Sequence, residues 1–136
     1  MPDVILSIHP KYAELILSGK KTVELRKRIW KKMVRRVYLY ATKPIQKLLG
    51  YFEILDTCFS LLPSLWKWSQ NYSYISRDEF DAYYNGHTSG IGIVINFVEK
   101  FKEPIDPFAL DPQFTIPQNF CYVSRDLEKK LNKIEV

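Results

Sequence analysis

The stretch Gly19-Lys20-Lys21-Thr22-Val23-Glu24-Leu25-Arg26-Lys27-Arg28 sets the organisation of the whole chain. Gly19 predicts the end of a preceding helix, because glycine adopts positive φ at little steric cost. From Thr22 onward the polarity alternates, which predicts a strand with Val23 and Leu25 on one face. The other face then carries a column of charge that is either a ligand site or a solvated strand surface. This column consists of Thr22, Glu24, Arg26 and Arg28.

The length and composition predict one cytoplasmic domain. A chain of 136 residues suits a single domain, 1–136. We expect its core at about residues 4–123, followed by a C-terminal helix at about 125–134. Cys58 and Cys121 lie far apart and match no metal-ligand spacing, so we expect reduced thiols, no metal and no other cofactor. The early Asp3 and the short apolar run 4–8 predict no secretory signal, and no apolar run is long enough for a membrane span.

The positive charge is concentrated in one segment. The chain has a net charge of +5, but residues 20–36 hold nine Lys or Arg and one carboxylate, Glu24, which is nine minus one, or +8. Such a patch is typical of a protein that binds polyanions, and the alternative is a solvated hairpin tip that keeps the protein soluble. The twenty aromatic residues (nine Tyr, eight Phe and three Trp) include enough rings for both a core and base stacking.

The order of the predicted elements favours an α+β fold. Three central strands follow one another without the intervening helices that parallel crossovers require, so we expect a small, mostly antiparallel β-barrel with helices on its rim. The predicted strands are Val4–Ile8, Thr22–Ile29, Arg35–Ala41, Leu48–Ile54 and Ile91–Val98. The predicted helices are Pro10–Ser18, Leu61–Gln70, Arg77–Asn85 (opened by the capping box of Ser76 and Glu79) and the C-terminal helix. Residues 101–117, with four prolines, are expected to form a loop.

Gly19, Lys21, Glu24 and Arg26 match the G-x-K-x-x-E-x-R signature of ASCH domains. The chain resembles this family in four further segments, in the same order, so that the resemblance covers about residues 4–123. These segments are Ser7–Ala13, Tyr40–Pro44 with Gly50–Ile54, Phe80–Gly86 and Pro117–Tyr122. The resemblance implies a PUA-like barrel, with a cleft between the first helix, the motif strand and the adjacent loops that binds RNA or nucleotides.

The chemistry of the motif agrees with such a ligand. Lys21, Arg26 and Arg28 can neutralise phosphate, and Glu24 can accept from base amino groups or orient Arg26. Arg36 shares one strand face with Tyr38 and Tyr40, which we expect to be exposed. His9 either caps the first helix or contacts the ligand. The candidate RNA- or nucleotide-binding residues are Lys21, Glu24, Arg26, Arg28, His9, Arg36, Tyr40, Lys43 and Tyr83.

The alternative to a binding module is a small hydrolase acting on RNA or on a modified nucleoside. The resemblance implies either a ribonuclease or an acetylcytidine amidohydrolase that uses Lys21. If the protein is an enzyme, the candidate catalytic residues are Lys21 and Glu24. Lys21 is activated if Lys20 and Arg26 lower its pKa. The amidohydrolase pattern has a threonine where this chain has Glu24, and a glutamate where it has Ser73-Tyr74.

Other assignments stay open for either enzyme. Glu24 or Glu79 is available as a general base, and Lys21, Tyr83 or His9 as the acid or base of a ribonuclease. A third possibility is a surface that docks a protein partner. We favour the binding module, with RNA or a nucleotide as partner and no membrane, and the sequence sets no oligomeric state.

Overall fold

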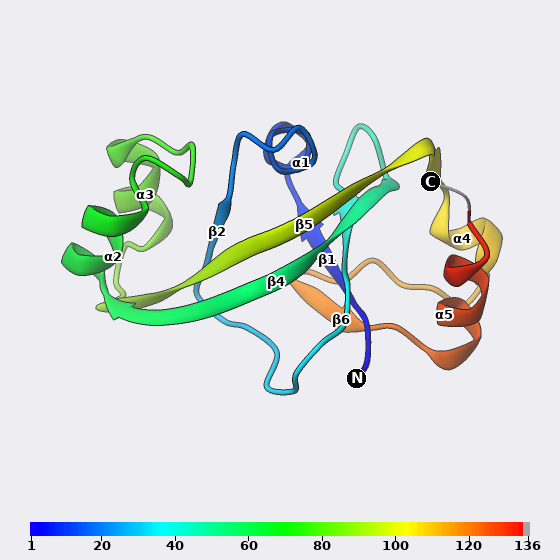
Figure 1. The fold of residues 1–136 in the computed structure, drawn as a ribbon. Helices are drawn as coiled ribbons and strands as arrows, with labels where there is room; N and C mark the ends of the chain where they lie inside the picture. The colour runs from blue at the N-terminus through cyan, green and yellow to red at the C-terminus, as the bar shows by residue number, and fades with distance from the viewer. Residues whose placement is uncertain (135–136) are drawn as a thin grey trace.

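Six strands form one sheet in the order β2-β5-β4-β3-β1-β6, as the computed structural model of the chain describes it over residues 1–134 (Figure 1). The last two positions of the expected domain, 135–136, lie outside the described residues. The strands are β1 (Val4–Ile8), β2 (Val23–Arg26), β3 (Val37–Ala41), β4 (Lys47–Leu61), β5 (Ser89–Ile105) and β6 (Phe120–Tyr122). The helices are α1 (Pro10–Leu17), α2 (Leu62–Ser69), α3 (Arg77–Tyr83), α4 (Pro107–Leu110) and α5 (Arg125–Asn132).

The sheet is mixed and open, so the expected α+β class is confirmed but a closed barrel is not found. Strand β1 pairs in parallel with β3, whereas the other four strand pairs are antiparallel. Strands β2 and β6 occupy opposite edges and are not paired with each other within residues 1–134. The parallel pair is possible because α1 and the passage through β2 give the chain a crossover long enough to return alongside β1.

Strands β4 and β5 are much longer than predicted and cross the molecule as one twisted ribbon (Figure 1). Three shifts of register in the pairing of β4 with β5, one between Leu48 and Gly50 and one on either side of Ile54, accommodate the twist. The prediction of a loop over residues 101–117 was wrong at its start, because β5 continues to Ile105, which pairs with Leu48. Pairing with a long partner strand thus overrides the local signal of the prolines.

The two faces of the sheet carry separate cores. Val4, Leu6 and Ile8 pack on the face that α1 covers, whereas Ile5 points to the opposite face. That second face also holds both tyrosines of β3, which lie under the segment that follows α4 and under α5. Its cluster includes Tyr38, Tyr40, Phe101, Phe114, Leu127 and Leu131. Each of the two α5 leucines contributes about 1.5–3 kcal/mol by burial.

The expectation that Tyr38 and Tyr40 are exposed was therefore wrong. Both side chains are fully buried, and the ring of Tyr40 lies 6.1 Å from that of Phe114. Alternation along β3 correctly separates two faces, but distant C-terminal residues cover the face that looked polar. No helix within residues 1–134 is long and apolar enough to cross a membrane.

Candidate functional site

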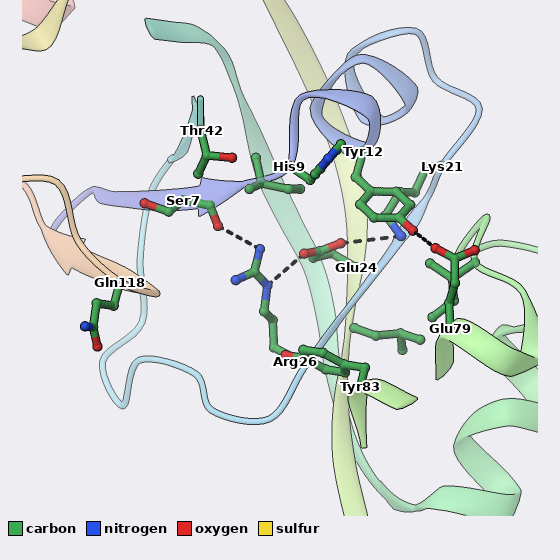
Figure 2. A pocket seen from close by; sticks show the side chains of 13 residues that line it. Ser7, His9, Tyr12, Lys21, Glu24, Arg26, Thr42, Glu79, Tyr83 and Gln118 are labelled. Carbon is green, nitrogen blue, oxygen red and sulfur yellow. Dashed lines mark hydrogen bonds and ion pairs between the residues drawn. The ribbon is translucent and has the colours of Figure 1, made fainter. Parts of the chain in front are cut away.

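A cavity of about 460 Å³ opens where the end of β1, the start of α1, strand β2 and helix α3 converge (Figure 2). We call it the pocket. Its walls combine charged, hydroxyl, amide and aromatic side chains with a few aliphatic ones. The lining residues are Ser7, Ile8, His9, Tyr12, Lys21, Glu24, Leu25, Arg26, Thr42, Ile75, Glu79, Tyr83 and Gln118.

The turn at Gly19 carries the chain from α1 into β2 and places the motif at the pocket. Gly19 has a φ of 84°, as its predicted role at the helix end requires. The carbonyl of Leu15 then accepts hydrogen bonds from the backbone N–H groups of Lys20 and Lys21, at 3.1 and 2.9 Å. The Lys21 side chain consequently enters the protein instead of pointing into water, and is 2% exposed.

Lys21, Glu24 and Arg26 form a buried ion cluster, which we call the pocket cluster. Glu24 Oε1 lies 3.4 Å from Lys21 Nζ, and Glu24 Oε2 accepts a hydrogen bond of 2.7 Å from Arg26 Nε. Arg26 also donates to Asn119 Oδ1 at 2.9 Å and to the carbonyl of Ser7 at 3.0 Å. At Glu24 and Arg26, the polar column of β2 therefore forms a wall of the pocket and is not a solvated strand surface.

Burial lowers the pKa of Lys21. Loss of hydration is the largest cause, Glu24 opposes it, and the Arg26 guanidinium adds a smaller lowering effect. The ammonium also donates to the carbonyl of Ser73 and lies 5.1 Å from the ring centroid of Tyr12. The expected lowering therefore has burial as its main origin and not the neighbouring cations.

A hydrogen bond from Tyr12 to Glu79 connects α1 with α3 beside the pocket (Figure 2). Burial and this bond raise the pKa of Tyr12 to about 12, and the same bond, as the largest cause, lowers the pKa of Glu79 to about 2. The second oxygen of Glu79 accepts from the backbone N–H of Ser76 at 3.1 Å, which completes the predicted capping box. Glu79 is thus a firmly ionised carboxylate and a weak base.

His9 does both things that the sequence left open: it caps α1 and it lines the pocket. Its Nδ1 accepts from the backbone N–H of Lys11 at 3.2 Å. A neutral imidazole with Nδ1 as acceptor carries its proton on Nε2. His9 can therefore offer an N–H group to a ligand. Tyr83, also a predicted site residue, lines the pocket from α3, and its hydroxyl accepts from the backbone N–H of Lys27 at 3.2 Å.

Four predicted site residues lie outside the pocket. Tyr40 is in the opposite core, and Arg36 stacks on that same side over Tyr51, with 4.2 Å between its guanidinium carbon and the ring centroid. Arg28 and Lys43 are exposed, the latter next to the pocket residue Thr42. The sequence reasoning missed Tyr12, Thr42 and Gln118 as site residues, although the segments that carry them were part of the family resemblance.

The family model named ASCH domain matches residues 6–105. The chain belongs to the ASCH family. It is 26% identical over 136 residues to an ASCH domain-containing ribonuclease of Zymomonas mobilis, an alignment that covers 95% of this chain and 89% of the relative. It is also 30% identical over 104 residues to the large ribosomal subunit protein uL22 of Ureaplasma parvum, covering 76% of this chain but 33% of that protein.

The fold of this ASCH domain agrees with that of a solved structure. The crystal structure of ASCH from Zymomonas mobilis superposes with a TM-score of 0.90 at 24% sequence identity, covering 96% of this chain and 94% of that chain. The resemblance drawn from the motif and its four companion segments is confirmed for the family and for the α+β class, but not for a closed barrel.

The interior of the ASCH pocket is balanced in charge instead of strongly basic. Its lining includes two cationic side chains, Lys21 and Arg26, and two carboxylates, Glu24 and Glu79. Cations stand instead beside two of its aromatic residues. Lys11 Nζ lies 5.6 Å from the ring centroid of Tyr12, and Lys27 Nζ lies 4.5 Å from that of Tyr83.

Residues 1–134 contain no group of three or more His, Cys, Asp or Glu side chains arranged to hold a metal ion. Both pocket carboxylates are already engaged, Glu24 by Lys21 and Arg26, and Glu79 by Tyr12 and Ser76.

Proposed function

We propose that this ASCH domain binds single-stranded RNA and holds one nucleotide in the pocket. The observation that carries the proposal is the division of charge: a balanced, hydrogen-bonding interior with lysines at its aromatic rim. The name of the Zymomonas relative, a ribonuclease, supports RNA as the ligand class. A nucleotide has the matching division, since its base is neutral and its flanking phosphates are anionic.

The interior suits a base. His9 offers an N–H donor, Glu24 offers carboxylate lone pairs, and the amide of Gln118 offers both kinds of group. These are the groups that recognise the Watson–Crick edge of an unpaired base. The rings of Tyr12 and Tyr83 provide surfaces for stacking. A volume of about 460 Å³ falls within the usual range of small-ligand sites, roughly 300–1,000 Å³.

The rim suits the backbone of the strand. Lys11 and Lys27 are exposed and lie against pocket rings, so phosphates on either side of the bound base would meet an ammonium group. A duplex cannot present its Watson–Crick edges to such a pocket, because those edges are already paired. The proposal therefore concerns single strands.

The test is a titration of labelled single-stranded RNA, followed by fluorescence anisotropy at two salt concentrations. Gln118→Ala and Tyr83→Leu change exposed pocket residues that carry little of the fold, and each should weaken binding about tenfold. Phe59→Ala is the matched control, since Phe59 is 73% exposed on β4 and does not line the pocket. Equal affinity for all four proteins would reject the pocket as the RNA site.

A second candidate, cleavage of the bound RNA, is favoured by the lowered pKa of Lys21 in the same pocket as the N–H of His9. In such a reaction Lys21 accepts the proton of the ribose 2′-hydroxyl, and the 2′-oxygen attacks the adjacent phosphorus. The bond from phosphorus to the 5′-oxygen breaks, and that oxygen takes up, through a water molecule, the proton that Lys21 accepted, while the N–H of His9 donates a hydrogen bond to the phosphate. The products are a 2′,3′-cyclic phosphate and a 5′-hydroxyl.

Cleavage and binding are separated by two changes. Lys21→Arg keeps a long hydrogen-bond donor at this position but cannot act as a base, so binding should persist while cleavage is lost. His9→Asn keeps a helix-capping side chain while removing the imidazole. An RNA with a single 2′-deoxy position should bind equally well and stay intact at that position. RNA that remains intact with the unaltered protein leaves the binding module as the function.

A further inference from the structure

Two segments leave the pocket side by side. One is the loop of residues 27–32 after β2, which we call the basic loop, and the other is the segment 118–122 that contains β6 (light blue and orange in Figure 1). Three contacts hold them together in order along their length, the first of them made by Arg26 at the end of β2, directly before the loop. These are Arg26 with Asn119 (Nη1 to Oδ1, 2.9 Å), Trp30 with Phe120 (ring centroids, 5.5 Å) and Lys32 with Tyr122 (Nζ to ring centroid, 5.1 Å).

The basic loop is held from inside and charged outside. Trp30 is 7% exposed and packs edge-on against Phe120, so the middle of the loop is anchored to the sheet. Four exposed cations flank that anchor, two before it and two after it. Residues 27–34 include no Asp or Glu. These cations are Lys27, Arg28, Lys31 and Lys32. An anchored loop that presents only cations is an electrostatic track for a phosphate backbone.

The same pair of residue types stands at each end of this track. At the pocket end Lys27 lies over the ring of Tyr83, and at the far end Lys32 lies over the ring of Tyr122. Tyr83 is 37% exposed and Tyr122 is 40% exposed, so both rings are accessible to a base. Exposed aromatic rings interleaved with cations are the usual means of binding single strands without regard to sequence.

We propose that Tyr122 and Lys32 form a second RNA subsite, and that the RNA strand runs from the pocket to this subsite along the basic loop. This inference rests on the proposed function. A base that stacks on Tyr122 takes the ring face that Lys32 now covers, and leaves the ammonium beside its phosphate. The four residue steps from Gln118 to Tyr122 span at most about 13 Å. That distance accommodates about four stacked nucleotides at roughly 3.4 Å each, so full affinity requires a strand longer than a trinucleotide.

The test compares random-sequence RNA pools of three and eight nucleotides by fluorescence anisotropy. Tyr122→Thr removes the ring but keeps a residue that favours strands, and Lys32→Gln removes the charge. Each should weaken binding of the eight-nucleotide pool about tenfold and change that of the three-nucleotide pool less than about twofold. Phe59→Ala and Lys129→Gln, an exposed ring and an exposed lysine elsewhere, serve as controls and should leave both affinities unchanged.

The outcomes distinguish the subsite from the pocket. The second subsite is overturned if Tyr122→Thr and Lys32→Gln bind the eight-nucleotide pool as tightly as the unaltered protein does. It is also overturned if these variants lose the same amount of affinity for both pools. Tyr83→Leu tests the pocket separately, since it should weaken both pools. If Tyr83→Leu has no effect while Tyr122→Thr weakens the longer pool, the pocket proposal fails and the subsite stands. No binding of either pool by the unaltered protein rejects both.

Discussion

The pocket cluster and the basic loop lie next to each other in the sequence, yet they use the same residue types in opposite ways. Lys21 and Arg26 are withdrawn from water and share one carboxylate, Glu24. Lys27 and Lys32 are exposed and lie over aromatic rings. A buried charge needs a partner because its lost hydration is costly, whereas an exposed charge keeps its hydration and remains free to meet a ligand. Positive charge in one segment is therefore paired inside the protein at one end, and at the other end it is available for the RNA recognition that we propose.

The largest effect is expected from Glu24→Gln, which keeps the shape of the side chain but leaves two buried cations without a carboxylate. Removing one partner of a buried ion pair typically costs about 3–5 kcal/mol, and we expect a loss of that size in the free energy of unfolding. Urea denaturation at neutral pH measures it. Asp81→Asn is the control, because its ion pair with Arg77 is more than half exposed and contributes under about 0.5 kcal/mol. Similar small losses in both variants would show that burial does not distinguish the cluster.

The next effect is a dependence of stability on pH that comes from Lys21. Its pKa in the folded state is below the ordinary 10.5, so between these two values the unfolded chain binds more protons than the folded one. The contribution of Lys21 to stability therefore rises with pH, by at most about 1.4 kcal/mol per pH unit. Denaturation at a series of pH values approaching 10.5 from below should show a steeper rise for the unaltered protein than for Lys21→Met. Lys20→Met, at an exposed position, should keep the steeper rise.

Local patterns predicted this site well where a short stretch determines the geometry. Gly19 and the alternation after it fixed the entry into β2, and the spacing of Ser76 and Glu79 fixed the start of α3. The family resemblance connected these elements to one cleft. The glycine turn and the capping box each depend on only a few neighbouring residues. The family resemblance supplied the arrangement of the elements around the cleft.

Contacts between distant segments could not be predicted in this way. The bond between Tyr12 and Glu79 joins residues 67 positions apart, and no periodicity along the chain relates them. Tyr40 was assigned to the site because alternation shows that a strand has two faces, but not which face later residues cover. Phe114 and α5 cover that face, and only the assembled fold reveals it.

A smaller effect concerns Glu79, whose carboxylate closes the pocket wall from α3. Because its folded pKa of about 2 is below the ordinary 4.5, Glu79 stabilises the fold above about pH 4.5, and this contribution is lost as the pH falls toward 2. Tyr12→Phe removes the largest cause of the shift. The pKa of Glu79, followed by NMR of its side-chain carboxyl carbon, should then rise toward 4.5. Ser76→Ala should raise it less, and an unchanged pKa in Tyr12→Phe would mean that the hydrogen bond is not formed in solution.

The smallest change in stability is expected in the basic loop, and it completes the comparison. Lys31→Gln removes an exposed charge, so the free energy of unfolding should change by less than about 0.5 kcal/mol. If the loop meets the RNA backbone as proposed, the slope of log K against log salt should become less negative by about 0.7, the value for one contact with a single strand. Lys129→Gln, on α5, should leave this slope unchanged. Glu24→Gln and Lys31→Gln would then differ in kind, because the first lowers the stability of the fold and the second changes only how affinity responds to salt. A loss of stability in Lys31→Gln with an unchanged slope would instead give the exposed cations the same structural role as the buried ones.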